Sequence, residues 1–301
     1  MTLSDKIQHS IEVLRKGEEL ALQYDQKGYL LAFSGGKDSQ CLYHIAKMAD
    51  VKFEPFFSPT TVDPPEVIRF IKKKYPDVVF IHPKKSIYEV AKERGVLPTM
   101  TRRWCCAEFK EIHGSNRVVL LGIRREESQK RSKRKEVEVF NKKYSENFDQ
   151  FSEHKEKMMA CVKGKDKIMV SPILEWTEKD VWNFLNDNNI EHCELYDRGY
   201  KRIGCILCPM STMKEKMRSL EEHPRVARKW AETIEWLQQN KWNANPRIEK
   251  LSVEQRMRWW FTGESFGEFM SDYLHPKLFS DIEKDKLDLL IDKALRYEEQ
   301  D

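Results

Sequence analysis

A run of two serines, two glycines, a lysine and an aspartate, SGGKDS at positions 34–39, is the first stretch of the chain whose residue types could do chemistry. A short apolar run over 29–33 precedes it, and apolar residues at helical spacing follow it over 38–49. This order predicts a strand, a glycine turn and the first turn of a helix. Backbone N–H groups and the helix dipole at such a turn can hold an anion, above all a phosphate. A strand-to-helix turn without a ligand is the alternative.

Two common phosphate-binding patterns do not match this turn. The chain lacks both the Walker A spacing of Gly, four residues, Gly, Lys and Ser or Thr, and the dinucleotide pattern Gly-x-Gly-x-x-Gly. The hexapeptide instead resembles the pyrophosphate loop of the adenine nucleotide alpha-hydrolase superfamily, whose members cleave ATP between the alpha and beta phosphates or bind an adenylyl sulfate. The resemblance implies that Lys37 neutralises developing charge and that Asp38 caps the helix or helps to hold Mg²⁺. It implies a cradle of phosphate oxygens built from Ser34, Gly35, Gly36 and Ser39.

The cysteines form the second group of residues with chemical potential. The chain has seven, and an odd number in a chain without secretory signals argues against a disulfide framework. Cys205 and Cys208 form a C-x-x-C pair that can face one metal centre, whereas Cys105 and Cys106 are adjacent, which is awkward for one tetrahedral zinc. Spacing alone leaves a zinc site and a [4Fe–4S] cluster about equally open, with unligated core cysteines as a third possibility.

The elements that position these residues alternate along the chain. An amphipathic helix is expected over about 4–25, and strands and helices follow in turn, which predicts an α/β fold with a doubly wound, Rossmann-like parallel sheet. Ligands of such sheets bind at the carboxyl ends of the strands, where SGGKDS lies. The expected strands are 29–33, 52–57, 78–82, 117–122 and 167–171, and the expected helices between them are 38–49, 65–74 and 86–94.

Three parts of the chain are expected: an N-terminal helix over 1–25, an α/β domain over 26–210 and a helical, aromatic-rich region over 211–301. The segment near 124–166 is polar and is expected to be an irregular insertion. Nine Lys and Arg face only four Glu between positions 124 and 143, which suggests contact with an anion or a nucleic acid, although a solvated loop has the same composition.

Composition argues against a membrane protein. Charged residues make up 34% of the 301 residues and apolar ones 40%, and the net charge is a modest +4. We find neither a secretory leader nor an apolar run of about 18 residues. A cytoplasmic location without membrane contact is therefore expected.

Five stretches together resemble the phosphoadenosine phosphosulfate (PAPS) reductase family within the same superfamily. They are SGGKDS, RRWCCAEFK, LGIRREESQKR, SPILEWTEKDVWNFL and LYDRGYKRIGCILCP, which span about residues 28–212 in the order found in the family. The resemblance implies an adenine nucleotide alpha-hydrolase-like fold, and SPILEWTEKDVWNFL itself is interpreted as a capped helix. In cluster-bearing members the two cysteine pairs hold one [4Fe–4S] cluster, here on Cys105, Cys106, Cys205 and Cys208.

The resemblance also implies roles for charged residues outside the first loop. Lys110 matches a family lysine near the cluster and the substrate phosphate or sulfate. Arg124 and Arg131 are candidate oxyanion clamps, with a salt-bridge cluster involving Glu126 and Glu127 as the alternative. Asp63 follows the second strand, where the family has an acidic substrate loop, and a simple helix cap is the alternative.

One departure from the family pattern bears on the reaction. Reductases of the family attack the substrate sulfur with a C-terminal cysteine, but no cysteine follows Cys208 here. Cys161 and Cys193 are the remaining candidates, and each is better explained as a buried residue.

The chain therefore looks closer to the ATP pyrophosphatases of DNA phosphorothioation systems, which carry the loop and the cluster cysteines but not the tail cysteine. This likeness implies cleavage of ATP with Mg²⁺ and activation of a phosphate-bearing acceptor, most plausibly DNA. Sulfur would come from a cysteine desulfurase or another sulfur-transfer protein. Reduction of an adenylyl sulfate and a non-catalytic nucleotide-binding subunit are the alternatives, and tRNA or a small molecule is the alternative acceptor.

Overall fold

The computed structural model describes residues 1–139, 167–242, 251–264, 266–274 and 282–297. The chain forms two compact units. Unit 1 comprises Met1–Pro59, Pro65–His82 and Glu111–Ile203, and unit 2 comprises Thr60–Pro64, Pro83–Lys110 and Gly204–Asp301. The division at positions 25 and 210 that we expect from the sequence stays a prediction.

A six-stranded sheet organises unit 1, with the strand order β3-β2-β1-β4-β6-β5. Neighbouring strands in the series β3-β2-β1-β4-β6 are parallel, and the edge strand β5 pairs with β6 in the antiparallel direction. Order 3-2-1-4 is that of a doubly wound sheet, in which the direction of winding reverses between β1 and β4. The fold class predicted from the sequence is confirmed. The strands are β1 (Tyr29–Ala32), β2 (Phe53–Phe57), β3 (Val79–Phe80), β4 (Val118–Leu120), β5 (Val137–Val139) and β6 (Ile168–Val170).

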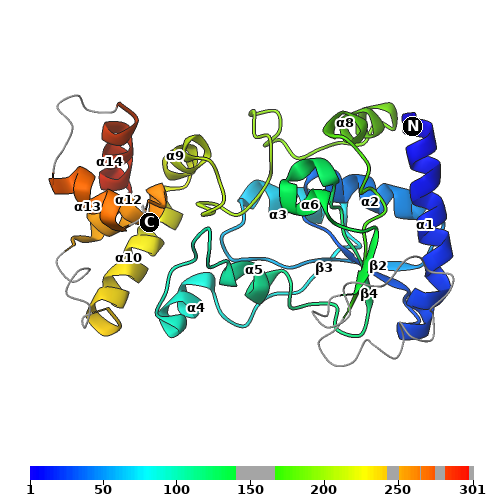
Figure 1. Ribbon diagram of the computed structural model, residues 1–301, viewed down its shortest axis with the longest axis horizontal. Helices are drawn as coiled ribbons and strands as arrows, with labels where there is room; N and C mark the ends of the chain where they lie inside the picture. The colour runs from blue at the N-terminus through cyan, green and yellow to red at the C-terminus, as the bar shows by residue number, and fades with distance from the viewer. Residues whose placement is uncertain (140–166, 243–250, 265, 275–281, 298–301) are drawn as a thin grey trace. The chain divides into compact units, whose positions relative to one another are not determined.

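Side chains alternate between the two faces of this sheet, as the pleat of a strand requires. Leu31 and Leu120 point into the larger core of the unit, whereas their neighbours Leu30 and Val119 belong to a small cluster with Phe56. The larger core also takes residues from four helices, so these helices cover that face of the sheet (Figure 1). They are α1 (Leu3–Tyr24), α2 (Lys37–Met48), α3 (Pro65–Lys74) and α8 (Glu178–Asp187).

The segment after β4 differs in part from the expectation of an irregular insertion. The described portion contains a short 3₁₀ helix, η1 (Arg125–Glu127), a helical turn, α6 (Gln129–Ser132), and strand β5. Pairing with β6 stabilises β5, and such long-range pairing leaves little trace in a short, highly charged sequence. The rest of the expected insertion, residues 140–166, lies outside the described residues.

Unit 2 is helical in its described portion, and its aromatic residues build its core. Trp230 and Trp260 are nearly fully buried and lie 4.9 Å apart between ring centroids. These two tryptophans therefore stabilise the unit and are not available to a partner. The helices are α4 (Ile87–Arg94), α5 (Trp104–Phe109), α9 (Met213–Glu222), α10 (Pro224–Asn240), α12 (Val253–Thr262), α13 (Phe266–Leu274) and α14 (Ile282–Leu295). Within the described ranges, no helix has the length and apolar character needed to cross a membrane.

Candidate functional site

The SGGKDS loop joins β1 to α2, as the sequence predicts, and lies at the reversal point of the sheet. The segment that follows β4, the neighbouring strand, carries Gly122 and Arg124. A side chain at Gly122 would place its Cβ 3.0 Å from the backbone carbonyl of Asp38, so the two loops pack against each other. Ligands of doubly wound sheets bind at this edge because the loops diverge there and leave a crevice.

Hydroxyl groups hold the loop in shape. Ser39 Oγ donates to the carbonyl of Gly36 at 2.8 Å and accepts from the backbone N–H of Ser34 at 3.2 Å. Ser34 Oγ lies 3.1 Å from Ser39 Oγ. The helix N-cap is Gly36, which has no side chain to satisfy the first N–H groups of α2, as a turn that accepts an external anion requires.

Gly35 has a backbone conformation that favours glycine, with φ of +72°. A Cβ at this position would lie 3.0 Å from Val67 Cγ1 and 3.1 Å from Ile71 Cδ1. Helix α3 therefore packs directly on the backbone of the loop.

We expect Gly35→Ala to lower the free energy of unfolding by about 2–4 kcal/mol, because backbone strain and overpacking add. Gly199→Ala is the matched control, since Gly199 has φ of +84° but open space around its Cα. That change should lower it by only about 1 kcal/mol. Urea denaturation measures both, and equal losses would show that the contact with α3 is unimportant.

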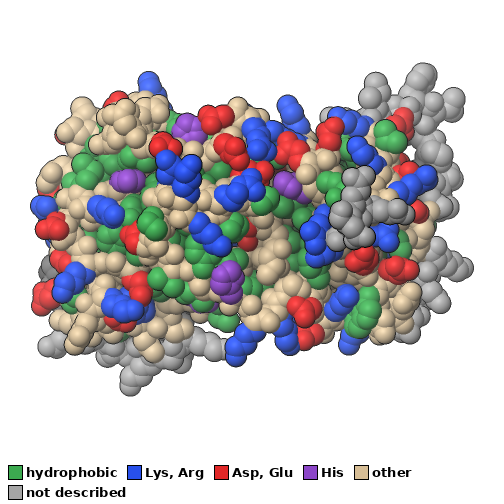
Figure 2. All heavy atoms as spheres, turned by 180° about the vertical axis from the view of Figure 1, so that it is seen from behind, with side chains coloured by type: hydrophobic (Ala, Val, Ile, Leu, Met, Phe, Trp, Pro, Cys, Tyr) green, Lys and Arg blue, Asp and Glu red, His purple; other side chains and the backbone are tan. Residues whose placement is uncertain are grey.

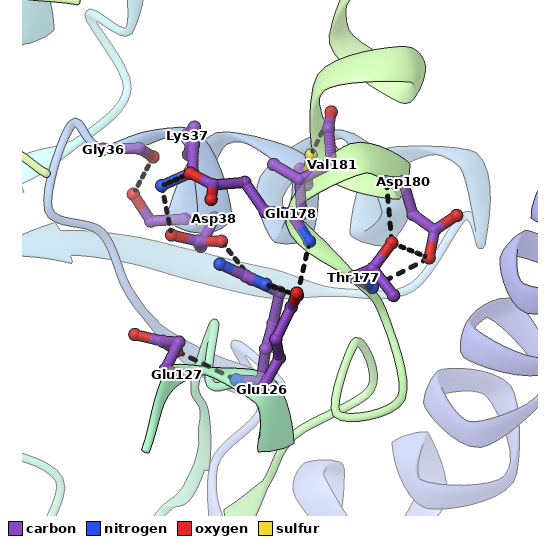
Figure 3. A network of polar contacts seen from close by, with 12 residues as sticks. Gly36, Lys37, Asp38, Glu126, Glu127, Thr177, Glu178, Asp180 and Val181 are labelled. Carbon is purple, nitrogen blue, oxygen red and sulfur yellow. Dashed lines mark hydrogen bonds and ion pairs between the residues drawn. The ribbon is translucent and has the colours of Figure 1, made fainter. Parts of the chain in front are cut away.

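Lys37 is the central charged group of the loop, with only 4% of its surface exposed. Its backbone N–H donates to the phenol oxygen of Tyr196 at 2.9 Å. Its Nζ lies 3.3 Å from Glu178 Oε1 and 3.6 Å from Asp38 Oδ2 (Figure 3). The same atom lies 3.3 Å from the carbonyl oxygen of Lys201. The side chain is therefore held in place before any nucleotide is bound.

Arg124 is buried and is engaged by carboxylates. Its Nε donates to Asp38 Oδ1 at 2.6 Å, and its Nη1 donates to Glu126 Oε2 at 2.9 Å. Burial by itself would lower the pKa of Arg124, but the neighbouring carboxylates, Asp38 foremost, outweigh it and raise this pKa. Glu127 accepts from the backbone N–H of Arg124 and pairs with Arg131. The salt-bridge alternative thus describes the geometry, and a role for either arginine as an oxyanion clamp stays a prediction.

Two residues of this site were missed in the sequence. Tyr196 lies in the stretch LYDRGYKRIGCILCP, and burial raises the pKa of its phenol, so the hydroxyl stays protonated. Glu178 lies in SPILEWTEKDVWNFL, which predicted only a capped helix, and that helix is present with Thr177 as its cap. Both stretches were recognised as motifs, but only the tertiary structure brings these two side chains to Lys37.

Unit 2 holds the four cysteines of the expected cluster, each partly exposed. Cys105 and Cys106 open α5, and the backbone N–H of Ile206 donates to the carbonyl of Val62 at 2.7 Å, which ties the C-x-x-C segment to the loop 60–64. A hydrogen bond between the adjacent thiols, followed in size by burial and by the charges of Cys106, Cys205 and Cys208, raises the pKa of Cys105. The other three thiols therefore lie within electrostatic range of Cys105.

Positive and hydroxyl groups surround these sulfurs. Thr60 Oγ1 donates to Cys205 Sγ at 3.4 Å, and an Arg103 guanidinium nitrogen lies 3.4 Å from Cys106 Sγ. Cys205 is the main cause that raises the pKa of Lys110. Lys110 therefore lies within electrostatic reach of Cys205, while its expected role near a cluster and the substrate phosphate or sulfate stays a prediction.

Asp63 belongs to the same group of residues in unit 2. Its carboxylate accepts from the backbone N–H of Thr60, three residues earlier. This bond lies within the loop 60–64 and is not the helix cap expected as the alternative, because a capping carboxylate accepts from an N–H that follows it in the chain. Burial raises the pKa of Asp63, and the charge of Lys110 partly opposes this shift. A nucleotide-binding role for Asp63 stays a prediction.

The expected [4Fe–4S] cluster stays a prediction, with which the chemistry of the four thiols is compatible. Within the described residues, no three His, Cys, Asp or Glu side chains converge on a position for a single metal ion. A [4Fe–4S] cluster takes one thiolate per iron, so its ligands do not need to converge on one point. Four interacting thiols beside Lys110 and Arg103 fit such a negatively charged group.

The other two cysteines in the described part of the chain are poorly suited to act as nucleophiles. Cys41 and Cys193 are completely buried, and burial raises the pKa of each thiol. Both act as small apolar residues of the unit 1 core, as expected for Cys193. Cys161, the other candidate, lies outside the described residues.

Comparison with known proteins identifies relatives of this chain. An uncharacterized protein of Methanocaldococcus jannaschii is 29% identical over 233 residues, which are 75% of this chain and 52% of that protein. An adenosine 5'-phosphosulfate reductase of Oceanobacillus iheyensis is 32% identical over 152 residues, which are 48% of this chain and 54% of the reductase. The chain thus spans about half the length of these two curated relatives.

A solved structure and a family model complete the comparison. The FMN adenylyltransferase of Candida glabrata superposes with a TM-score of 0.45 at 15% identity, covering 68% of this chain and 62% of that protein. The model of the phosphoadenosine phosphosulfate reductase domain matches residues 28–211, more than half of the chain and the span of the five motifs. The chain therefore belongs to the phosphoadenosine phosphosulfate reductase family.

Proposed function

We propose that this protein binds ATP at the SGGKDS loop and cleaves it between the alpha and beta phosphates. The observation that carries the proposal is the buried ammonium of Lys37 at an N-terminus of α2 that has no side-chain cap. A buried cation at a helix N-terminus without a side-chain cap favours a polyanion over a neutral ligand.

The roles of the loop residues follow from their positions. An oxygen nucleophile attacks the alpha phosphorus, the bond from that phosphorus to the bridging oxygen breaks, and pyrophosphate leaves with the electron pair. The N–H groups of the loop and Lys37 stabilise the charge that develops on the pyrophosphate. Asp38, held by Arg124 at 2.6 Å, keeps the first turn of α2 in register with the loop after β4.

Mg²⁺ is the expected companion of ATP, and it would supply further charge neutralisation on the phosphates. Asp38 is the residue of the loop with a carboxylate for it, and 21% of that side chain is exposed. Carboxylate oxygens and substrate phosphates are the ligands that Mg²⁺ prefers.

Product analysis tests this proposal. ATP labelled at the alpha phosphate should yield labelled AMP or an adenylylated acceptor, and ATP labelled at the gamma phosphate should yield labelled pyrophosphate. The assay needs anaerobically purified protein with Mg²⁺, with and without DNA and a cysteine desulfurase. Formation of only ADP and phosphate would contradict the proposal.

We further propose that Cys105, Cys106, Cys205 and Cys208 hold a [4Fe–4S] cluster. The influence of the other three thiols on Cys105, the Arg103 guanidinium 3.4 Å from Cys106 Sγ and the effect of Cys205 on Lys110 support this assignment. The cluster would supply a fixed inorganic charge or a one-electron centre. Lys110 and Arg103 would balance the negative charge of the ligated thiolates.

The proposed acceptor is a phosphate-bearing macromolecule, DNA, which is activated through its phosphate before a sulfur-transfer partner supplies sulfur. Three exposed lysines within six residues, Lys130, Lys133 and Lys135, support contact with phosphates. The arginines of the same segment offer less support, because Arg125 and Arg134 pair with Glu175 and Glu138. On the face drawn in Figure 2, basic and acidic side chains are interspersed.

Replacing these three lysines with glutamine should weaken duplex DNA binding. The slope of log affinity against log salt concentration should fall by about two to three units, because each phosphate contact releases about one counterion. Fluorescence anisotropy between about 50 and 200 mM salt measures this slope. An unchanged slope, or no binding by the unmodified protein at low salt, would refute DNA contact by this segment.

Reduction of an adenylyl sulfate is the second candidate, and the reductase of Oceanobacillus iheyensis is the observation that favours it. That reaction needs a nucleophilic thiol, and Cys193 is buried with a raised pKa. Sulfite release from adenosine 5'-phosphosulfate that is lost in Cys161→Ser would favour reduction. Binding of ATP without cleavage, even with partners present, would favour a non-catalytic subunit.

A further inference from the structure

We propose that Glu178 is a positioning residue that pairs with Lys37 and must be displaced when a nucleotide phosphate binds. This inference rests on the proposed function, since it concerns the same lysine. Glu178 Oε1 lies 3.3 Å from Lys37 Nζ, a position that a phosphate oxygen could take.

The backbone of Glu178 is fixed. It is the first residue of α8, whose start is closed by reciprocal hydrogen bonds between Thr177 and Asp180. The N–H of Glu178 donates to Glu126 Oε2 at 2.7 Å, and Asp180 pairs with Lys6 at 2.6 Å. The side chain of Glu178 reaches from the start of α8 toward Lys37 (Figure 3). Its carboxylate can therefore leave Lys37 by a change in side-chain torsions alone.

The exposed fractions of Lys37 and Glu178 indicate which of the two side chains moves when a phosphate binds. The side chain of Lys37 is 5% exposed, whereas that of Glu178 is 52% exposed. Lys37 is also held by the Lys201 carbonyl, and its ammonium lies 5.7 Å from the centroid of the Tyr196 ring. An arriving phosphate therefore finds Lys37 already placed, and the Glu178 carboxylate turns out into water.

The replacement of the Glu178 carboxylate by a ligand anion affects which ligands can bind at Lys37. A weak monoanion gains little by replacing one carboxylate on Lys37, while a pyrophosphate group brings several charges and also accepts from the loop N–H groups. Glu178 thus favours polyphosphates over single anions such as chloride or sulfate. It also lowers the affinity for every phosphate ligand by the free energy of breaking one half-exposed ion pair.

The test compares Glu178→Gln with Glu175→Gln in otherwise unmodified full-length protein. Glu175 is an ideal control because its side chain is also 52% exposed and ion-paired, but to Arg125. Inorganic pyrophosphate and ATP are titrated calorimetrically at low salt, with EDTA and again with Mg²⁺. Glu178→Gln should bind pyrophosphate about 3- to 10-fold tighter, as expected for loss of one competing surface charge. Glu175→Gln should match the unmodified protein.

Further readouts separate positioning from a structural role. Chloride or sulfate should compete with pyrophosphate more effectively in Glu178→Gln, and the gain in affinity should shrink as salt rises. In turnover, KM for ATP should fall by a similar factor while kcat changes by less than about twofold. Equal or weaker pyrophosphate binding by Glu178→Gln would overturn the inference.

The two proposals can fail separately. If Glu178→Gln binds pyrophosphate tighter but ATP yields ADP and phosphate, the inference stands and the proposed cleavage is wrong. If ATP yields AMP and pyrophosphate but affinity does not rise in Glu178→Gln, the proposed function stands and the inference is wrong. Absence of pyrophosphate and ATP binding by the unmodified protein would overturn both.

Discussion

Replacing Lys37 with methionine should lower the rate of ATP cleavage between the alpha and beta phosphates by about 100- to 1,000-fold, the effect of removing one preorganised charge from a transition state. Methionine keeps the length and burial of the side chain but not the ammonium, which is the group that stabilises the leaving pyrophosphate. The measurement is the initial rate of labelled pyrophosphate release. Binding of pyrophosphate, measured calorimetrically, should weaken in the same variant.

Two further variants keep this prediction decisive. Lys37→Arg retains the charge and should recover part of the activity, which shows that lost activity does not reflect lost folding. Lys27→Met is the control, because Lys27 is a 67% exposed lysine paired with Glu54 in the same unit. An unchanged rate in Lys37→Met, with circular dichroism like that of the unmodified protein, would refute the assignment of Lys37.

Replacing Cys205 with serine should remove most of the iron from anaerobically purified protein. The expected cluster has four irons, and loss of one thiolate ligand leaves one of them without its protein ligand. The unmodified protein should be brown with a broad visible shoulder and contain about four irons and four sulfides per chain. Cys205→Ser should contain less than about one iron after the same purification.

Cys193→Ala is the control for this change. Cys193 lies in the core of unit 1 and its thiol is completely buried, so its removal should leave the iron content unchanged. Iron and sulfide analysis, together with electron paramagnetic resonance of the reduced protein, measures the outcome. Stoichiometric zinc without iron or sulfide in the unmodified protein would show that the four thiols hold a different metal.

The strands and helices around the SGGKDS loop could be predicted from local sequence. The apolar run 29–33 and the periodic stretch 38–49 correspond to β1 (Tyr29–Ala32) and α2 (Lys37–Met48), and the other predicted strands and helices are present within one or two residues. Buried parallel strands are nearly continuous apolar runs, and helices that pack on them have apolar residues at a period of 3.6, so both leave a clear local pattern. Strand β5 was missed because its pairing with β6 is not local.

Some residues of the candidate site could likewise be predicted from local sequence, and others could not. Motifs alone indicated Lys37, Asp38 and the four cysteines, because glycine turns and closely spaced thiols are recognisable without knowing which distant segments lie beside them. Local spacing also indicated the alternative role of Arg124, because Glu126 is two residues away from it.

Only the tertiary structure decided which side chains surround Lys37. Tyr196 and Glu178 are 159 and 141 positions away along the chain, and each reaches Lys37 because α2 and the segments around α8 pack on the same face of the sheet. A contact between such distant residues depends on the packing of whole elements, and neither residue type nor local spacing encodes it. The sequence by itself thus indicated a loop of the phosphate-binding type. The tertiary structure decided that the lysine of this loop is buried and that its ammonium pairs with the carboxylate of Glu178.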